Sequence, residues 1–454
     1  MQIAIVGSGP AGFYSLQSLL SKDPPGLRVD LFERLPAPFG LLRYGVAPDH
    51  PKIKSVTAVF ERLARDPRVR LFGGVEFGRD LTIDDLAHHY DHAVICTGAE
   101  SDRRLNIPGE DLRRSHSATE FVAWYNGHPD FADRVFDLDQ ERALVVGVGN
   151  VAADVARILC RTTEDLARTD IADHALEALS RSRVREVVVV GRRGPVQAAF
   201  SNPEMEELLA LAGVEVVVDP NDLVLDARDL AAAAADRSVA RRIELLQGAG
   251  RRTPGAGPKR LTLRFLTSPV EIYDDGHGGV GAVRLVRNEL VVGDDGTVRA
   301  RATDRAEMLD VGLVFRSVGY RGVPLPGVPF DDREGRVPND AGRVLDRATG
   351  APIPGLYVSG WIKRGPQGVI GTNKPDAAET IAQLVADHAA GIGFGPRDRD
   401  PDAVVRLLTG RGVRPVTRDD WDRLDALEVE RGRANGRPRV KLVRREEFAR
   451  ALAT

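Results

Sequence analysis

Three glycines close to the start of the chain, Gly7, Gly9 and Gly12, constrain its fold more than any other feature. Residues 3–6 before them are apolar and mostly β-branched, which is typical of a buried parallel strand. Residues 11–20 after them favour a helix. In such a unit the first glycine permits a tight turn, the second lets a pyrophosphate approach the backbone, and the third lets helix and strand pack closely. The phosphates would bind at the helix N-terminus, where N–H groups and the helix dipole favour anions.

A second predicted strand, residues 28–32, ends at Glu33. This glutamate follows the glycine turn by about 20 residues, a position where a carboxylate can accept hydrogen bonds from ribose hydroxyls. A glycine turn alone is weak evidence, because such turns also occur for purely structural reasons. The strand, the turn, the helix and Glu33 together predict a dinucleotide-binding site.

The same pattern occurs a second time along the chain. A predicted strand at 143–146 leads into Gly147, Gly149 and Ala152, a G-x-G-x-x-A turn that opens a predicted helix at 153–159. We therefore predict a second dinucleotide-binding unit.

The two units differ at the end of their second strand. Where the first unit has Glu33, the predicted strand 186–190 is followed by Arg192 and Arg193. A guanidinium fork suits a phosphate dianion, so the second site should prefer NADP(H) to NAD(H). The spacing from turn to arginines is longer than usual, which requires the helical stretch 163–179 to be an insertion. The alternative is that the two arginines form only a solvated basic turn.

The order of the patterns places the second unit inside the first. We predict segments 1–105, 106–319 and 320–454, with a strand at 356–360 that rejoins the first domain and a charged helical tail after Pro401. The predicted fold class is α/β, with two Rossmann-like domains.

The remaining elements follow from periodicity and turn residues. Residues 35–50 are rich in proline and glycine and predict a shaped loop of the kind that often lines a cofactor. Strands are predicted at 69–72, 94–98, 214–218, 261–265 and 311–318, with hairpin-like strands between 270 and 300. Helices are predicted at 53–64, at 227–247, and from Pro375, since proline is favoured in a first helical turn, to His388.

Composition excludes several classes of protein. The chain has 454 residues, 43% hydrophobic and 28% charged, which is ordinary for two or three globular domains. A net charge of −3 gives no overall attraction to nucleic acid, and no apolar run is long enough for a membrane span. The two cysteines, Cys96 and Cys160, exclude a cysteine-ligated iron–sulfur cluster, a redox dithiol and a disulfide scaffold. No metal site is predicted, and because the first strand begins at once we expect no signal peptide and a cytoplasmic protein.

Three long runs match one known family in sequence and in order. They are 45–54 (GVAPDHPKIK), 191–200 (GRRGPVQAAF) and 360–373 (GWIKRGPQGVIGTN). On these runs the chain resembles the adrenodoxin-reductase-type ferredoxin–NADP reductases, which are glutathione-reductase-like flavoproteins. The similarity spans essentially the whole chain, including 436–441, and looks closest to bacterial members without a fused ferredoxin domain.

The resemblance implies FAD in the first domain and NADPH in the second, so that the NADP domain is inserted into the FAD domain. The family's FAD contacts fall on Ala11, Glu33, Leu41, Val75, Trp361, Gly368, Val369 and Ile370. Its NADP contacts fall on Asn150, Val151, Ala152, Ala153, Arg192, Arg193, Glu204 and Gly368. The nicotinamide must then reach the flavin, which divides a two-electron hydride into single electrons.

The resemblance also singles out His50, Asp154 and Glu204 as candidate catalytic residues. In the family, the counterpart of His50 lies beside the flavin and beside the acid equivalent to Asp154. A histidine changes charge near neutral pH, so His50 can supply a proton or position the nicotinamide, or it can be a structural loop residue. Glu204 and Glu207 follow a predicted helix start, where the dipole alone favours acids. Asp154 can equally be a packing or capping residue, and hydride transfer itself requires no acid or base.

A basic cluster, Arg237, Arg241 and Arg242, occurs at helical spacing. In family members an arginine-rich segment at this place docks the acidic ferredoxin, which would make the rate salt-dependent. The alternative is a solvated helix face. We therefore predict an NADPH:ferredoxin oxidoreductase, operating in either direction. An NADPH diaphorase or quinone reductase, and a redox sensor that binds FAD and NADP(H) without moving electrons, are the alternatives.

Overall fold

The computed structural model describes residues 1–252 and 257–453, which form two compact units. Unit 1 comprises Met1–Ser101 and Gly319–Thr454, and unit 2 comprises Asp102–Val318. The first boundary therefore follows Ser101, where the sequence predicts 105. Leu105 belongs to unit 2 because it packs against that unit's core and donates its N–H to the buried Glu110 carboxylate, at 2.7 Å. The second boundary follows Val318, where the sequence predicts 319.

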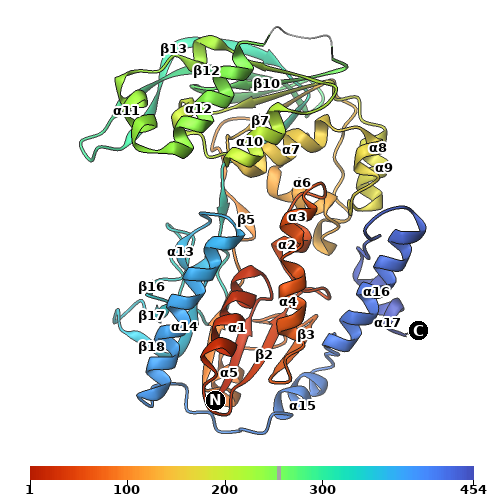
Figure 1. The fold of residues 1–454 in the computed structure, drawn as a ribbon, viewed down its shortest axis with the longest axis vertical. Coiled ribbons are helices and arrows are strands. Elements are labelled where there is room, and N and C mark those ends of the chain that lie inside the picture. The colour runs from red at the N-terminus through yellow and green to blue at the C-terminus, as the bar shows by residue number, and fades with distance from the viewer. Residues whose placement is uncertain (253–256, 454) are drawn as a thin grey trace. The chain divides into compact units, whose positions relative to one another are not determined.

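Unit 1 is built on a seven-stranded sheet in the order β16-β17-β18-β4-β1-β2-β3 (Figure 1). The strands from β18 to β3 are parallel, and β16 and β17 are antiparallel. The seven strands are β1 (Gln2–Val6), β2 (Arg28–Glu33), β3 (Val69–Gly73), β4 (His92–Ile95), β16 (Asn339–Asp340), β17 (Arg343–Leu345) and β18 (Pro352–Val358). Strands β5 (Ser101–Asp102) and β15 (Tyr320–Arg321) form a separate two-stranded sheet. The helices are α1 (Pro10–Lys22), α2 (Leu41–Tyr44), α3 (Pro51–Lys54), α4 (Thr57–Ala64), α5 (Ile83–His89), α13 (Trp361–Arg364), α14 (Asn373–Ala389), α15 (Ala403–Gly410), α16 (Arg418–Ala434) and α17 (Arg445–Ala453), with a 3-10 turn, η4, at Ile370–Thr372.

The central strand of this sheet is buried on both faces. Along β1, Ile3 and Ile5 enter one hydrophobic cluster, while Ala4 and Val6 enter a second cluster on the opposite face. This explains the unbroken apolar run in the sequence, because a covered parallel sheet needs no polar face. Helices α1 and α14 pack against each other over one face (Figure 1). Strand β18 lies beside β4, so the segment after unit 2 completes the sheet as predicted.

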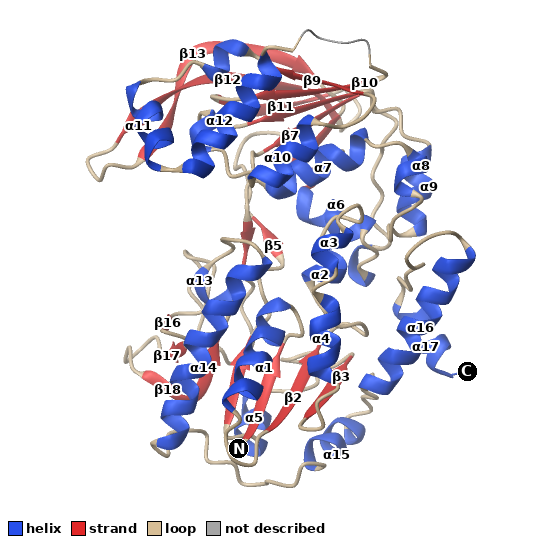
Figure 2. Cartoon of the chain, viewed as in Figure 1, coloured by secondary structure: helices blue, strands red, loops and turns tan. Residues whose placement is uncertain are grey.

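Unit 2 contains a six-stranded parallel sheet in the order β6-β14-β7-β8-β10-β9. Figure 2 labels β7, β9 and β10 of this sheet. Its strands are β6 (Ser115–Ser117), β7 (Arg142–Val146), β8 (Glu186–Val190), β9 (Val214–Val218), β10 (Lys259–Arg264) and β14 (Leu313–Arg316). Its helices are α6 (Ala118–Tyr125), α7 (Asn150–Cys160), α8 (Thr163–Leu166), α9 (Asp173–Ser180), α10 (Asn202–Leu209), α11 (Ala227–Ala235) and α12 (Arg237–Gly250). Three 3-10 turns complete it, η1 (Pro129–Phe131), η2 (Pro195–Gln197) and η3 (Pro220–Leu223).

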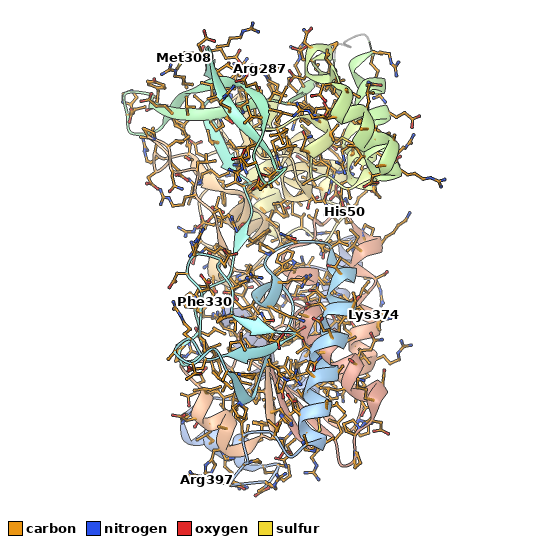
Figure 3. All side chains as sticks on the ribbon, turned by 90° about the vertical axis from the view of Figure 1, so that its left-hand side faces the viewer. His50, Arg287, Met308, Phe330, Lys374 and Arg397 are labelled. Carbon is orange, nitrogen blue, oxygen red and sulfur yellow. The ribbon has the colours of Figure 1, made fainter. Side chains whose placement is uncertain are left out.

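A separate antiparallel sheet covers part of unit 2. It consists of β11 (Thr267–Asp274), β12 (Val280–Val292) and β13 (Val298–Asp310). Val283 and Leu285 of β12 share a hydrophobic cluster with the main sheet, which fixes the small sheet on one face of the large one. Met308 on the outer strand β13 is 52% exposed, and Figure 3 labels it with Arg287 of β12.

Three predicted helices are interrupted, each by a local polar contact or a tertiary hydrogen bond. The stretch 53–64 is divided into α3 and α4 because the Ser55 hydroxyl donates to the Lys52 carbonyl, at 2.7 Å. The stretch 163–179 is α8 and α9, since the Ala172 N–H between them donates to Tyr125 of α6. The stretch 227–247 is α11 and α12, because the Asp236 side chain accepts from the first N–H groups of α12.

Two further predictions about loops and helix starts are wrong in detail. The predicted loop 35–50 contains a four-residue helix, α2, which follows Gly40 in a left-handed conformation at φ +47°. Helix α14 begins at Asn373 and not at Pro375, because η4 runs directly into it. Pro375 is still accommodated, since the first N–H groups of a helix have no intrahelical acceptor. Among the helices of residues 1–252 and 257–453, none combines the length and apolar character needed to cross a bilayer.

His116 makes the stability of unit 2 sensitive to acid. Its ring packs on Phe136 and Phe315, with centroids 4.7 and 5.9 Å away. Burial, reinforced by the charges of Arg316 and Arg134, lowers the pKa of His116 from 6.5 to about 4. The folded state therefore binds this proton less readily than the unfolded state. The stability contribution is complete above the unfolded pKa and is lost as the pH falls toward the folded pKa.

The unfolding free energy of the wild type should decrease when the pH falls from about 7.5 to about 5. We expect this decrease to be smaller by roughly 2 kcal/mol in His116→Phe, which replaces the titrating ring by one that extends the aromatic cluster. Urea unfolding at the two pH values measures this. The exposed His277 offers a control, since His277→Gln should leave the pH difference unchanged. An undiminished acid loss in His116→Phe would contradict the assignment.

Candidate functional site

The three glycines of the first turn differ in what surrounds them. A Cβ atom at Gly12 would lie 2.0 Å from the Gly7 carbonyl oxygen, and one at Gly7, which has φ +105°, would lie 2.5 Å from that of Cys96. Packing therefore requires glycine at both positions. A Cβ at Gly9 would meet nothing closer than the Cα of Gly40, at 3.9 Å. The turn consequently leaves room at Gly9, where the sequence places the approach of a pyrophosphate.

The helices that follow both turns begin without a side-chain cap. The N-cap residues of α1 and α7 are Gly9 and Gly149, which have no side chain to accept the first N–H groups. By contrast, α5 and α16 are capped by the hydroxyls of Thr82 and Thr417. Unpaired N–H groups at a helix N-terminus form an anion site, so both turns fit the phosphates of a dinucleotide.

Glu33 is held rigidly beside the first turn. Its Oε2 accepts hydrogen bonds from the Ser8 N–H and hydroxyl, at 3.1 and 2.6 Å, and its Oε1 accepts from the Leu35 N–H, at 3.0 Å. The side chain is 9% exposed. A carboxylate oxygen has two lone pairs, so Oε1 retains capacity for a ribose hydroxyl.

The other predicted FAD residues lie around this turn within unit 1. Val75 donates its N–H to the Glu33 carbonyl, at 2.9 Å. A Cβ at Gly360 would touch the Cβ of Ala11 at 2.5 Å, so the segment that begins with Trp361 abuts the start of α1. Leu41 follows Gly40, the residue that faces Gly9.

The loop from Gly365 to Ile370 is open and shaped by glycine. Trp361 donates its indole N–H to the Gln367 carbonyl, at 3.2 Å, which closes the loop at its base. Gly368 has φ +81°, and the neighbouring Val369 is 55% exposed. Gly368 and Val369 of the family motif are therefore exposed, whereas Gly360, Ile362 and Gly365 are buried.

The second turn has the same construction. A Cβ at Gly147, which has φ +136°, would lie 2.1 Å from the Ser317 carbonyl oxygen. Ala152 and Ala153 are fully buried, while Val151 is half-buried. Asn150 accepts the Ser201 N–H through its Oδ1, at 2.8 Å, and so ties the start of α7 to the start of α10.

Arg192 and Arg193 stand on a fixed loop after β8. Their carbonyl oxygens accept hydrogen bonds from Asn288 and from the Leu266 N–H, at 2.9 and 3.0 Å. Arg192 is exposed and Arg193 half-buried. Within the described part of the chain, neither guanidinium makes an ion pair or a hydrogen bond. A rigid loop with two available guanidinium groups matches the predicted phosphate selectivity.

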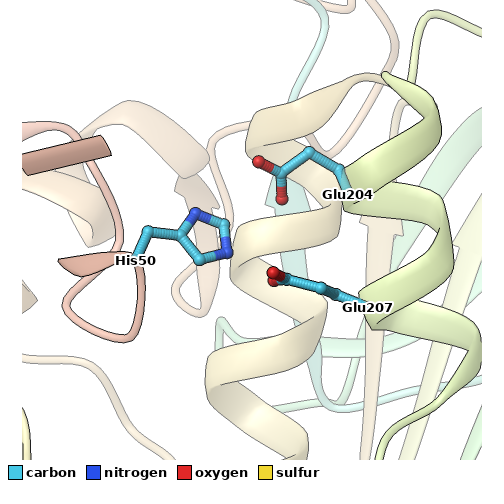
Figure 4. Close-up of side chains that lie close together, drawn as sticks. All are labelled: His50, Glu204 and Glu207. Carbon is cyan, nitrogen blue, oxygen red and sulfur yellow. The ribbon is translucent and has the colours of Figure 1, made fainter. Parts of the chain in front are cut away.

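Asp154 and Glu204 share a partner that the sequence analysis missed. Arg157 of α7 is fully buried and contacts Asp154 Oδ1 at 2.7 Å and Glu204 Oε2 at 3.2 Å. Glu207 lies one turn after Glu204 on the same side of α10 and is exposed (Figure 4). The spacing of Asp154 and Arg157, three residues apart on a helix, was the available signal. The two carboxylates are thus held in place by one buried cation.

His50 lies in the other unit. It is 7% exposed, precedes α3, and donates its backbone N–H to the Ala47 carbonyl, at 3.1 Å (Figure 4). The three predicted catalytic residues therefore come from both units, His50 from unit 1 and the two acids from unit 2.

Of the three arginines of the predicted basic cluster, only Arg241 makes an ion pair to another described residue. Arg241 on α12 pairs with Glu206 and Glu244, at 2.7 and 2.9 Å. Arg242 is half-buried and donates to the Val196 carbonyl, at 3.1 Å. Of the three arginines, Arg237 alone is exposed with no ion pair to another described residue.

Comparison with known proteins gives full-length matches. A model of the pyridine nucleotide-disulphide oxidoreductase family matches residues 1–222. The chain is 49% identical to NADPH-ferredoxin reductase FprA of Mycobacterium tuberculosis, over 99% of this chain and 98% of that protein. It is 44% identical to human mitochondrial NADPH:adrenodoxin oxidoreductase, over 99% and 92%. The solved structure of M. tuberculosis FprA in complex with NADPH has a TM-score of 0.93 at 48% identity, covering 100% of this chain and 99% of that one. The predicted fold class is confirmed.

Proposed function

This chain belongs to the adrenodoxin-reductase-type family of ferredoxin–NADP reductases, and we propose that it carries electrons from NADPH through FAD to a small iron–sulfur protein. One observation supports this most directly, the opposite charges at the ends of corresponding strands. Glu33 follows the first glycine turn, and Arg192 with Arg193 follows the second. A carboxylate suits an unphosphorylated ribose, and paired guanidinium groups suit a phosphorylated one.

In the proposed first site, the residues of unit 1 bind and orient FAD. The uncapped start of α1 accepts the pyrophosphate, and Glu33 accepts the ribose hydroxyls. Leu41, Val75, Trp361 and the loop Gly368 to Ile370 are proposed to contact the remainder of the cofactor. When bound, FAD accepts a hydride and releases its two electrons one at a time.

In the proposed second site, the residues of unit 2 bind NADPH. The uncapped start of α7 accepts the pyrophosphate, and Arg192 and Arg193 bind the 2′-phosphate. Asp154 and Glu204, held by Arg157, are proposed to orient the nicotinamide end, and His50 is proposed to act at the flavin end. These three residues would adjust the site, since hydride transfer needs no proton donor. The reverse direction, reduction of NADP⁺ by ferredoxin, uses the same contacts.

An anaerobic absorbance titration of the purified protein tests the function. We expect a yellow protein whose flavin absorbance is lost on addition of stoichiometric NADPH. The same amount of NADH should leave the absorbance largely unchanged, because the guanidinium groups at the second site select for the 2′-phosphate. Turnover with quinones and dyes but not with any ferredoxin would favour the diaphorase alternative. A bound flavin that NADPH cannot reduce would favour the redox-sensor alternative.

The double variant Arg192→Ala/Arg193→Ala tests the selectivity. We expect it to weaken NADPH binding by about 2–4 kcal/mol, through loss of charge-assisted hydrogen bonds, and to change NADH binding little. Binding is measured for both nucleotides by titration of the oxidised protein with NADP⁺ and NAD⁺ and by steady-state KM. Arg168→Ala, at an exposed arginine of the same unit, is the control. Equal losses for both nucleotides would argue against the assignment.

We further propose that the acidic iron–sulfur partner docks on α12, with Arg237 supplying the available charge and Arg241 and Arg242 shaping the surface. Arg237→Gln is expected to slow ferredoxin reduction several-fold at low ionic strength, with the difference disappearing at high salt. Stopped-flow rates across a salt series give the measurement, with the dye-reduction rate as reference and Arg168→Gln as control. Identical ferredoxin rates at low salt would remove α12 as the docking surface.

A further inference from the structure

We propose that the C-terminal segment 418–443, here called the C-terminal clasp, retains FAD by fixing residues 39–44 against the first glycine turn. Residues 39–44 are Phe39, Gly40 and helix α2, and are here called the loop. This inference rests on the proposed function, because it presupposes FAD at that turn. The sequence assigned no role to this charged helical segment.

The loop 39–44 lies directly on the glycine turn. The Phe39 N–H donates to the Ser8 carbonyl, at 3.0 Å, and a Cβ at Gly40 would lie 2.9 Å from the Cα of Gly9. Phe39 has φ +85°, a conformation that a bulky residue adopts only where its surroundings impose it. Any movement of this loop therefore changes the space at Gly9 where the pyrophosphate is proposed to bind.

A buried ion pair connects the loop to the clasp. Arg43 donates from Nη1 and Nη2 to the two carboxylate oxygens of Glu428, at 2.9 and 2.5 Å. Arg43 is 5% exposed and Glu428 is fully buried. Glu428 also accepts the Leu442 N–H at 2.7 Å and an Arg439 N–H at 3.2 Å. Although burial acts in the opposite direction on each group, their mutual attraction raises the pKa of Arg43 and lowers that of Glu428, so both stay charged.

Two further side chains of the clasp contact the same loop. Trp421 meets the Phe39 ring edge-on with centroids 5.9 Å apart, and its own ring lies 5.3 Å from the Arg43 guanidinium. Lys441 donates from Nζ to the Arg43 carbonyl, at 3.2 Å. The clasp thus touches the loop at Phe39, beside the turn, and at Arg43, beyond Leu41.

The chemistry of the Arg43–Glu428 ion pair indicates that it fixes the position of the loop more than it stabilises the fold. Desolvation offsets much of the attraction in a buried ion pair, and apolar residues of similar size often stabilise a fold as well. A bidentate pair instead fixes distance and angle, which matters where a strained loop borders a binding site. Arg43, Glu428 and Trp421 are therefore positioning residues for FAD, acting through the loop.

Arg43→Lys and Glu428→Gln test this in the full-length holoprotein. Lysine keeps the charge but loses the two-point contact, and glutamine keeps the size but loses the charge. We expect each variant to release FAD about tenfold faster than the wild type, because a charged two-point contact is lost from the bound state. The rise of free-flavin fluorescence after dilution measures release without any turnover. Trp421→Phe, which weakens the contact with the guanidinium and keeps an aromatic ring beside Phe39, provides the test if either polar variant does not fold.

The control variant is Arg70→Lys. Arg70 makes a comparable two-point contact with Asp30 in unit 1, at 2.8 and 2.7 Å, and no hydrogen bond, ion pair or ring contact among the described residues joins it to the loop or the clasp. It should lower the thermal midpoint and leave FAD release unchanged. The proposal would be overturned if Arg43→Lys, Glu428→Gln and Trp421→Phe released FAD at the wild-type rate. It would also be overturned if Arg70→Lys released FAD as fast as these variants. A wild-type protein without flavin absorbance would instead overturn the proposed function, before any variant is made.

Discussion

The close approach of α1 to β1 at the first glycine turn is the constraint on which the rest of unit 1 depends. With 2.0 Å between a hypothetical Cβ at Gly12 and the Gly7 carbonyl oxygen, no other residue permits the helix to begin where it does. This position leaves α1 with a glycine N-cap that has no side chain, brings Glu33 to the same end of the sheet, and places Gly40 against the Gly9 backbone. The proposed anion site is thus a consequence of backbone packing, and side chains are proposed only to select what binds.

In the proposed function, selection between the two sites depends on charge at one topological position. Both units repeat the same strand–turn–helix geometry, and both leave the helix start uncapped. They differ in the loop after the second strand, which carries one buried carboxylate in unit 1 and two available guanidinium groups in unit 2. A protein that uses two related nucleotides together needs such a difference, because backbone N–H groups bind either pyrophosphate equally well.

Sequence patterns predicted the features of the fold that depend on residues close together in the chain. Both glycine turns, Glu33, the arginines after β8 and the longer strands follow from spacing along the chain. The strands of two or three residues, β5, β6, β15, β16 and β17, were not predicted. Three predicted helices were interrupted, because Ser55, Ala172 and Asp236 make hydrogen bonds that periodicity does not reveal. Helices α5 and α6 were missed, although capping residues mark the start of each.

What the sequence could not reveal depends on contacts between distant segments. Arg157 resembles an ordinary helix residue until α10 brings Glu204 to it, and Arg241 looks free until Glu206 pairs with it. The Arg43–Glu428 pair joins residues 385 positions apart, beyond the reach of any periodic pattern. The family resemblance supplied roles for Glu204 and for the basic cluster, but only the structure gave Glu204 and Arg241 their charged partners.

The insertion of unit 2 has a consequence for the order in which the chain folds. Strand β18 pairs with β4 across the whole of unit 2, so the sheet of unit 1 stays incomplete during synthesis until residues 352–358 emerge. Every strand of unit 2 has emerged before then, and long-range pairing is slow because loop closure must precede it. Unit 2 can therefore fold first, while the edge of β4 that later pairs with β18 remains unpaired. Chain growth then delivers β18 before the segment 418–443, so the proposed FAD site acquires its contacts with that segment only after the sheet of unit 1 is complete.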